Sequence, residues 1–315
     1  PFKCWINVDF PEPETLFDDY TTRGPQMKTQ ELTIDRHMGY AFDFKVRELK
    51  NEPTLQYIRD SWLMAMAEMD SKQRATWEAI YDKKNEEFLK NPPVGKDLLR
   101  WKYQRYVKEY CRTIRSVDEQ VGRLLDYLEE KGVLDNTVIV YTSDQGFLLG
   151  EHGLYDKRFM YEESFRTPLI ISCPSLVKKH SVCKELVQNI DLAPTFLSLA
   201  GVEVPKEMSG RSLLPLFKNG KAENWRNELY YHFYDYPAVG SVRKHDGIRT
   251  KRYKLIHWYG EGSGNDEAID FWELYDLKKD VMEVNNVYDN PKYVKVREAL
   301  TVQLEKLRKD VGVTE

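Results

Sequence analysis

Residues 137–158 read TVIVYTSDQGFLLGEHGLYDKR, and most of what the sequence predicts about the fold depends on this stretch. Its first five residues are β-branched, apolar or aromatic, which is typical of a buried strand. The polar segment 142–146 follows directly at the carboxyl end of that strand. A second apolar run at 168–172 predicts the next strand. Strands that alternate with loops and helices favour a largely parallel α/β sheet, whose ligands bind at the carboxyl ends of strands.

Helices are predicted on both sides of this stretch. Residues 60–92 are rich in Ala, Met, Glu and Lys and predict one helix, which the prolines at 92 and 93 end. Residues 96–131 predict a second helix, and Gly132 is well placed to cap it. One apolar stripe of this helix should face a core; it consists of Ile114, Val117, Val121, Leu124 and Leu128. A third helix should begin at Asp191.

The character of the sequence changes after about residue 225. Short strand-like pieces with turns between them predict a small antiparallel sheet; they are residues 229–234, 246–249, 253–257 and 272–275. A final helix is predicted at about 291–309. We therefore expect two domains, at 1–225 and 226–315.

Composition and charge exclude some classes of protein. The chain has 47 Lys and Arg against 51 Asp and Glu, a net charge of −4, which gives no basic field for nucleic acid. It contains no apolar run long enough to span a membrane. The 20 Tyr and 7 Trp suit a sugar cleft as well as a core. The four cysteines show no zinc spacing, although Cys173 and Cys183 could pair in an oxidising compartment.

Polar residues of several kinds gather in 142–158. Asp144 and Gln145 offer hard oxygen ligands, which suit Ca²⁺ or Mg²⁺. Zinc prefers histidine or thiolate, so Gln145 argues against zinc. The alternative is a turn in which the aspartate and the glycines only satisfy backbone groups. Physical arguments from the residues alone leave these two interpretations open.

Several linked motifs resemble the C-terminal signature of the type I, formylglycine-dependent sulfatases. That family reads SD(H/N/Q)G, then GEHG, then a lysine, then YE followed by RxP. The matching residues here are 143–146 (SDQG), 150–153 (GEHG), Lys157 and 161–168 (YEESFRTP). Later matches at 191–195 and 273–277 extend the resemblance over about 96–310. Within the family, the chain is most similar to bacterial mucin-desulfating and N-acetylglucosamine-6-sulfatase-like members.

The resemblance implies a fold, an activity and site residues. The fold would be α/β, an alkaline-phosphatase-like α/β/α sandwich present in part, with residues 226–315 as a small α+β subdomain that contains an antiparallel sheet. The activity would be the removal of sulfate from a sulfated sugar or glycan, with Ca²⁺ and a formylglycine as cofactors, in the periplasm or outside the cell. Asp144 and Gln145 match calcium ligands, and Lys157 matches a lysine that contacts sulfate. His152 would either face the sulfate or orient the loop.

The sequence also departs from the family. Formylglycine forms from Cys or Ser in a [C/S]xPxR motif, and the chain contains none. Residues 111–115 imitate it, but Thr113 replaces the proline and Cys111 falls inside a predicted helix. The chain begins at Pro1, and Pro1 and Phe2 resemble the remnant of an upstream strand. We therefore expect that the N-terminal part, with the nucleophile and the other calcium ligands, is missing and that this chain is inactive alone.

A second group of residues is a candidate for substrate binding. Arg243, His245 and Arg249 are expected around a tight turn, where they suit sulfate and sugar hydroxyls; the alternative is a solvated hairpin tip. Two other functions stay open for the protein. One is a phosphate or phosphonate monoester hydrolase of the same superfamily, and the other is a non-catalytic remnant that binds sulfated glycans.

Overall fold

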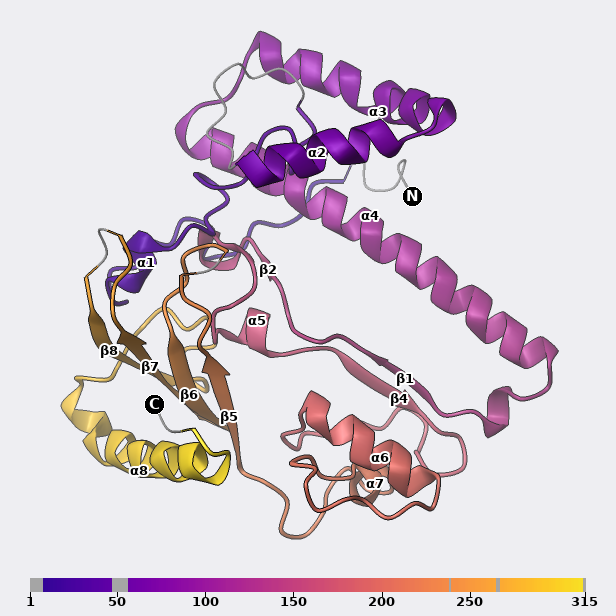
Figure 1. Ribbon diagram of the computed structural model, residues 1–315, viewed down its shortest axis with the longest axis vertical. Coiled ribbons are helices and arrows are strands. Elements are labelled where there is room, and N and C mark those ends of the chain that lie inside the picture. The colour runs from indigo at the N-terminus through magenta and orange to yellow at the C-terminus, as the bar shows by residue number, and fades with distance from the viewer. Residues whose placement is uncertain (1–7, 47–55, 238, 265–266, 314–315) are drawn as a thin grey trace. The chain divides into compact units, whose positions relative to one another are not determined.

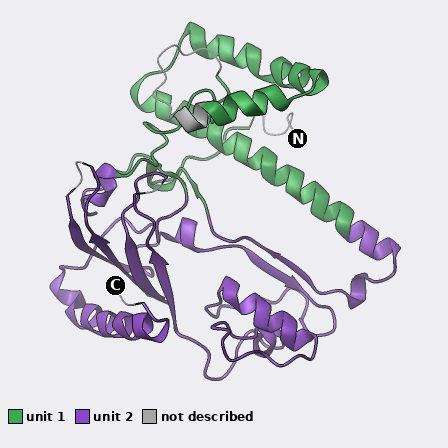
Figure 2. Ribbon diagram, viewed as in Figure 1, with its two compact units in different colours: residues 1–19, 30–124, 147–156 green, residues 20–29, 125–146, 157–315 purple. Residues whose placement is uncertain are grey.

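The computed structural model describes residues 8–46, 56–237, 239–264 and 267–313 (Figure 1). Two compact units result, which Figure 2 shows in different colours. Unit 1 comprises residues 1–19, 30–124 and 147–156, and unit 2 comprises 20–29, 125–146 and 157–315. Unit 2 runs across residue 225, and the division at 225 stays a prediction.

Unit 1 contains two helices where the sequence predicted one. They are α2 (Gln56–Glu68) and α3 (Ser71–Lys90). Asp70 separates them because its side chain accepts a hydrogen bond from the backbone of Gln73 at 2.8 Å, while the Gln73 side chain accepts one from the backbone of Asp70 at 2.9 Å. This capping box starts a new helix, so the prediction of a single helix over 60–92 was wrong.

The long helix α4 (Gly95–Glu130) confirms the prediction for 96–131. Its N-terminal half is buried at Tyr103, Tyr106 and Val107. Its C-terminal half is different, because Ile114, Val117 and Leu124 are 46%, 44% and 57% exposed. Within the described residues, the apolar stripe therefore does not face a core as expected.

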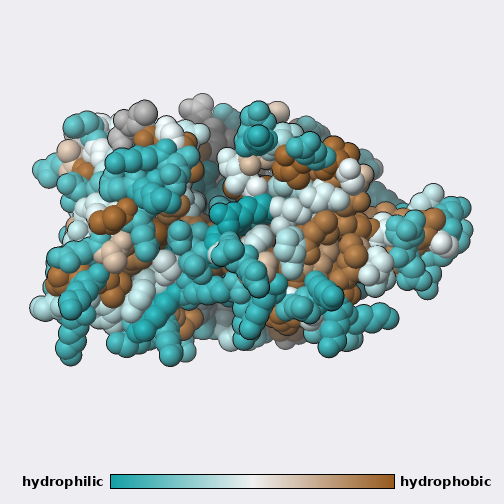
Figure 3. Space-filling view, turned by 90° about the horizontal axis from the view of Figure 1, so that it is seen from below, coloured by the Kyte–Doolittle hydropathy of each residue, from teal (hydrophilic) through white to brown (hydrophobic). Residues whose placement is uncertain are grey.

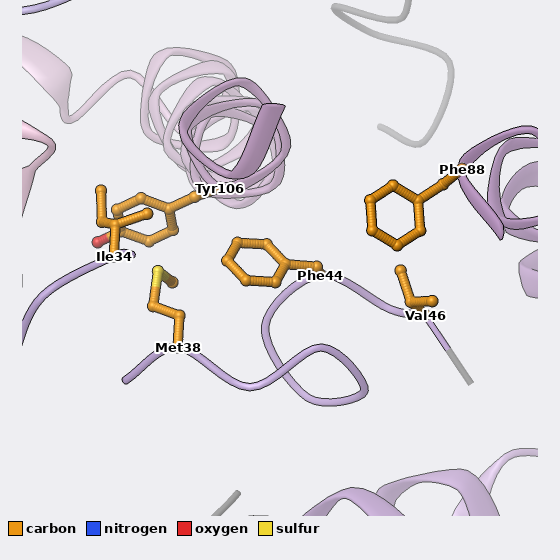
Figure 4. Packing of buried hydrophobic residues seen from close by; sticks show 6 residues of the cluster. All are labelled: Ile34, Met38, Phe44, Val46, Phe88 and Tyr106. Carbon is orange, nitrogen blue, oxygen red and sulfur yellow. The ribbon is translucent and has the colours of Figure 1, made fainter. Parts of the chain in front are cut away.

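The core of unit 1 joins residues 30–46 to helices α3 and α4. Figure 4 shows its side chains pointing toward one another from these three segments; they are Ile34, Met38, Phe44, Val46, Phe88 and Tyr106. Arg105 is buried beside them and donates to the Phe44 carbonyl at 2.8 Å. The Tyr106 hydroxyl donates to the Leu148 carbonyl at 3.0 Å. This bond ties α4 to a small hairpin of β2 (Leu148–Leu149) and β3 (Tyr155–Asp156), with the turn η2 (Glu151–Gly153) between them.

In unit 2 the two strands around the polar segment pair with each other. They are β1 (Ile139–Thr142) and β4 (Leu169–Ser172), and Ile139 lies opposite Ser172 in an antiparallel register. The expected parallel pairing was wrong for these strands. A parallel pair needs a crossover, usually a helix. In unit 2 the connection contains only the four-residue helix α5 (Glu162–Phe165), so the chain returns in the opposite direction.

Several short elements complete this part of unit 2. Helix α6 (Leu192–Leu199) confirms the helix predicted at Asp191, and Gly201 follows it with a φ of 70°. The remaining elements are α1 (Gln26–Thr29), η1 (Leu134–Asn136), η3 (Asn189–Asp191) and α7 (Leu214–Phe217). Among the described residues, Cys111, Cys173 and Cys183 are free thiols, so the suggested pairing of Cys173 with Cys183 was wrong.

The C-terminal sheet of unit 2 confirms the predicted antiparallel strands. Its four strands lie in sequence order: β5 (Glu228–Phe233), β6 (His245–Thr250), β7 (Tyr253–Gly260) and β8 (Ile269–Asp276). Helix α8 (Val294–Asp310), which follows the turn η4 (Pro291–Tyr293), packs Leu300 and Leu304 on one face (Figure 1). Rings of the 157–165 segment pack on the other face, where Phe159 lies 6.1 Å from Trp258 between ring centroids.

Hydrophobic side chains reach the surface in places, as the space-filling view shows (Figure 3). In unit 2 they include Ile170 at 63% on β4 and Phe196 at 47% on α6. Among the described helices, none is long and apolar enough to cross a membrane.

Two glycines near the end of α4 give a test of this helix. Gly132 has a φ of 66° and ends the helix, whereas Gly122 lies inside it with nothing within 4 Å of an added Cβ. Gly132→Ala should lower the free energy of unfolding by about 1 kcal/mol, because alanine is strained at that φ. Gly122→Ala should raise it by roughly 0.5–1 kcal/mol, because alanine favours a helix interior. Urea unfolding of both variants measures this, and equal shifts would contradict the assigned helix end.

Candidate functional site

The loop 143–146 leaves β1 and carries the two predicted metal ligands. Asp144 is exposed, and one carboxylate oxygen, Oδ1, accepts hydrogen bonds from the Gln145 backbone at 3.1 Å and the Ser143 hydroxyl at 3.3 Å. Gln145 is half-buried, and its side-chain amide makes no hydrogen bond to the described residues. Neither side chain is packed into the core. A carboxylate and an amide oxygen on consecutive residues are therefore available as ligands.

The backbone of this loop is held from two directions. Asn189 donates its side-chain amide to the carbonyls of Ser143 at 3.2 Å and Asp144 at 2.8 Å. On the other side, the Gly146 backbone donates to the carbonyl of Ser164 in α5 at 2.8 Å. A Cβ on Gly146 would lie 2.0 Å from the Glu163 carbonyl oxygen, so only glycine fits against α5. The loop is thus fixed through its main chain. The side chains of Asp144 and Gln145 are not needed to hold the loop and can bind other partners.

Lys157 begins the next segment of unit 2. Its side chain is half-buried, and its ammonium makes no hydrogen bond or ion pair to any residue that the structure describes. Lys157 is therefore a cation available for an anionic ligand. Its predicted contact with sulfate stays a prediction.

His152 belongs to unit 1 and is 1% exposed. Its ring Nδ1 lies 2.9 Å from the Asp18 carboxylate, and its backbone donates to the Thr15 hydroxyl at 2.8 Å. The residue has a φ of 55°, in the left-handed region, and lies in the turn between β2 and β3. These contacts brace the turn, which was one of the two roles considered for His152. The other role, facing the sulfate, stays a prediction.

The structure does not place Arg243, His245 and Arg249 around the tight turn that the sequence predicted. His245 and Arg249 lie in strand β6, because the chain turns later, between Thr250 and Tyr253. The tight turn was therefore predicted at the wrong place. Arg243 is 3% exposed and donates to the carbonyls of Gly260 at 3.1 Å, Glu261 at 3.2 Å and Glu267 at 2.9 Å.

Burial also determines the protonation state of His245. The ring is fully buried, its centroid lies 4.1 Å from that of Trp258, and its Nδ1 lies 2.9 Å from the Arg243 carbonyl oxygen. Burial lowers the pKa of His245 to about 4, so the ring is neutral near pH 7. Arg249 forms an ion pair with Glu162 at 2.9 Å. The role of all three residues in substrate binding stays a prediction.

Comparison with known proteins identifies the family of this chain. Residues 13–202 match the family described as "Sulfatase", and residues 150–310 match "N-sulphoglucosamine sulphohydrolase, C-terminal". The first match covers more than half of the chain and includes the loop with Asp144 and Gln145. The chain belongs to the sulfatase family.

Two relatives of this chain are the most informative. The chain is 45% identical to the N-acetylglucosamine-6-O-sulfatase of Bacteroides thetaiotaomicron over 96% of this chain and 53% of that protein. A solved structure of a protein in complex with its substrate D-glucosamine-2-N,6-O-disulfate superposes with a TM-score of 0.89 and 43% identity, over 98% of this chain and 61% of the other. The chain therefore spans about half the length of the curated Bacteroides thetaiotaomicron relative. The predicted fold class, an alkaline-phosphatase-like α/β fold present in part, is confirmed.

A more distant relative bears on the alternative function. The phosphonate monoester hydrolase of Silicibacter pomeroyi has a TM-score of 0.57 and 25% identity, and the match covers 70% of this chain and 44% of that one. Sulfatases and phosphonate hydrolases thus share this part of the fold.

Sulfatases generally use Ca²⁺ and formylglycine, and the described residues fit these two groups differently. Asp144 and Gln145 suit Ca²⁺ through their oxygen donors. No cluster of three or more His, Cys, Asp or Glu side chains that could hold a metal occurs within the described residues, so this loop offers only part of a coordination sphere. Cys111 does not fit a formylglycine precursor, because it lies inside α4 and Thr113 stands where the motif needs proline.

Sequence reasoning missed a buried charged network behind the loop. Lys254 of β7 is fully buried, and its ammonium lies 2.9 Å from Glu162 and 2.7 Å from Glu283. Burial opposes ionisation of Glu162, but Lys254 and Arg249 outweigh it and lower its pKa to about 2. For Glu283, burial outweighs Lys254 and raises the pKa to about 7. The only signal in the sequence was a lysine among the apolar residues of a predicted strand.

Glu283 gives this network a pH dependence. Its pKa is raised from 4.5 to about 7, so the folded protein keeps a proton that the unfolded chain releases. The free energy of unfolding should therefore fall as the pH rises from 4.5 to about 7. Glu162 acts in the opposite direction and only below pH 4.5, because its pKa is lowered to about 2.

Replacing Glu283 by glutamine should remove its part of this slope. We expect a flatter dependence of the free energy of unfolding on pH between 5 and 7 for Glu283→Gln than for the wild type. Glu223→Gln, at an exposed position, is the control and should leave the slope unchanged. Chemical denaturation at several pH values measures both. A slope in Glu283→Gln equal to that of the wild type would show that Glu283 is ionised in the folded protein.

Proposed function

We propose that the protein containing this chain hydrolyses the 6-O-sulfate ester of N-acetylglucosamine or a related glucosamine sulfate. The observation that carries the proposal is the fixed loop on which the Asp144 carboxylate and the Gln145 amide are available together. The name of the Bacteroides relative supports the choice of substrate, since the identity of 45% extends over nearly the whole chain. We place the activity in the periplasm or outside the cell, where sulfated glycans are met.

The described residues would act on the sulfate group through charge. Asp144 and Gln145 would hold Ca²⁺, which when bound neutralises charge on the sulfate oxygens. The unpaired ammonium of Lys157 would bind a sulfate oxygen or the departing alcohol oxygen, where negative charge develops in the transition state. A lysine suits this task because its ammonium is a compact charge that several oxygens can approach. The sequence of this chain contains no [C/S]xPxR motif, so its described residues include no formylglycine precursor.

A phosphonate or phosphate monoester hydrolase is the second candidate. Its support is the likeness to the Silicibacter pomeroyi enzyme, which shares this part of the fold at 25% identity. Both kinds of ester present a tetrahedral anion, so the loop and Lys157 would serve either one. The higher identity to the sulfated-glucosamine relative favours the sulfatase.

The proposal is tested with the protein produced from its complete gene. With Ca²⁺ present, it should release sulfate from N-acetylglucosamine-6-sulfate and should act far more slowly on a phosphonate monoester. Lys157→Ala should lower kcat/KM by roughly a hundredfold, about 3 kcal/mol, because it removes a preorganised cation from the reacting group. Ion chromatography of the released sulfate measures the first result, and steady-state kinetics measures the second.

Lys179→Ala is the matched control for the lysine variant. Lys179 is an exposed lysine of the same unit, so its removal should leave kcat/KM and the melting temperature unchanged. Wild-type kinetics for Lys157→Ala would assign that lysine to the solvent. Faster hydrolysis of the phosphonate monoester than of the sugar sulfate would favour the second candidate, and the absence of both activities would favour a binding protein.

A further inference from the structure

We propose that Arg249 and Lys254 are positioning residues that hold the Asp144–Gln145 loop in place through Glu162 and helix α5. The inference deepens the proposed function, because it concerns the same candidate metal loop and rests on it for its functional meaning. Arg249 would then hold the loop rather than bind substrate. The buried Lys254 would hold the same loop, a role that packing alone does not require.

The first step is the fixation of Glu162, the first residue of α5. Lys254 lies 2.9 Å from one carboxylate oxygen, and Arg249 lies 2.9 Å from the other. The nitrogen Nε of Arg249 donates a further bond to the first oxygen at 3.3 Å. The backbone of Glu162 donates to the Glu283 carboxylate at 2.7 Å. Side chain and main chain of one residue are thus bound to strands β6 and β7 and to the segment after β8.

The second step carries this fixation to the loop. Helix α5 has only four residues, so fixing Glu162 fixes the carbonyl of Ser164 within the same turn. That carbonyl accepts the hydrogen bond of the Gly146 backbone at 2.8 Å. The Gly146 backbone also approaches α5 so closely that an added Cβ would lie 2.0 Å from the Glu163 carbonyl oxygen. A displacement of α5 must therefore move Gly146 or break its bond.

The third step concerns the ligand side chains. Gly146 lies two residues after Asp144 and directly after Gln145, and Asn189 holds the carbonyls on the other side of the loop. Because both ends of the loop are held, the backbone that carries the Asp144 and Gln145 side chains is fixed. Ligands held in this way bind a cation without first paying for ordering of the loop.

The chemistry of Lys254 favours positioning over simple stabilisation. Removing a lysine from water is costly, and a buried ion pair often contributes no more to stability than an apolar replacement of the same volume. What a buried pair with several hydrogen bonds does supply is a fixed geometry. The ammonium of Lys254 is bound to Glu162, Glu283 and the Met160 carbonyl, the last at 2.6 Å. All three partners lie outside the sheet, in or next to the segments that the sheet must hold.

The test compares two arginines of the same hairpin. Arg249 and Arg252 each hold a carboxylate with two hydrogen bonds, but the partner of Arg252 is Asp276, in the neighbouring strand β8. Arg249→Ala should speed amide hydrogen exchange at Gly146 by about fivefold, the effect expected for loss of a partly exposed ion pair. Arg252→Ala should leave exchange at Gly146 unchanged. Hydrogen–deuterium exchange of the purified protein, resolved at the peptide that contains Gly146, measures both, and equal exchange in the two variants would overturn the proposal.

Two further variants keep the test decisive. Arg249→Lys keeps a positive charge and should restore part of the protection at Gly146. Lys254→Met leaves the buried Glu283 carboxylate without its cation and Glu162 with Arg249 alone, and it could prevent folding. It is therefore paired with the double variant Lys254→Met/Glu283→Gln, which also removes the Glu283 charge. The double variant should fold and still exchange faster at Gly146. Normal protection there would remove Lys254 from the proposal.

Calcium dependence separates this proposal from the proposed function. In an active protein, Arg249→Ala should raise the Ca²⁺ concentration needed for half-maximal activity, whereas Arg252→Ala should not. If the wild type releases no sulfate but Gly146 exchanges faster in Arg249→Ala, the positioning role stands and the sulfatase function fails. If the wild type is active and Arg249→Ala changes neither exchange nor calcium dependence, the function stands and the positioning role fails.

Discussion

The ionised carboxylate of Glu162 is the constraint on which the rest of unit 2 depends. It is four-fifths buried, so its charge must be balanced by the protein rather than by water. Arg249 and Lys254 supply that balance from adjacent strands of the C-terminal sheet. Because Glu162 also begins α5, the same ion pairs fix the helix against which the Asp144 loop is bound. Sheet, helix and candidate metal loop are thereby connected within one unit by ion pairs and hydrogen bonds.

The cations of unit 2 divide into two groups by what they bind. Arg243 and Lys254 are buried and are committed to carbonyls or carboxylates of the fold. Lys157 is half-buried and binds none of the described residues. A cation of this second kind is the one that an anionic substrate can reach without breaking an internal contact. This contrast supports Lys157, and not Arg243, as the residue that meets a sulfate group.

Local sequence patterns predicted where helices and strands occur better than they predicted how these elements pack. The period of α4 and the alternation within β5 to β8 are properties of neighbouring residues, so both were predicted from the sequence. The break between α2 and α3 depends on one side chain, Asp70, and was missed within a sequence that otherwise favours helix. The antiparallel pairing of β1 with β4 depends on how the connection returns, which periodicity does not encode.

In the candidate site, too, features set by neighbouring residues were predicted and features set by distant residues were missed. Asp144, Gln145 and Lys157 lie in one stretch of sequence whose spacing resembles that of the sulfatases, and the structure leaves their side chains available. Arg243 and His245 were expected near a ligand because of their chemistry, but strand position and burial are set by residues far away in the sequence. The contacts of Glu162 with Lys254 and Glu283 span 92 and 121 residues, and no local pattern predicts them.

The central claim is that the fixed loop is a half-site for a divalent cation. A crystal structure of the protein from its complete gene, grown with Ca²⁺ and a non-hydrolysed sugar sulfate, tests it most directly. The account predicts a cation at about 2.3–2.6 Å from oxygens of both Asp144 and Gln145, with the Lys157 ammonium facing a sulfate oxygen. A cation bound elsewhere, with Asp144 and Gln145 in contact with solvent alone, would contradict it.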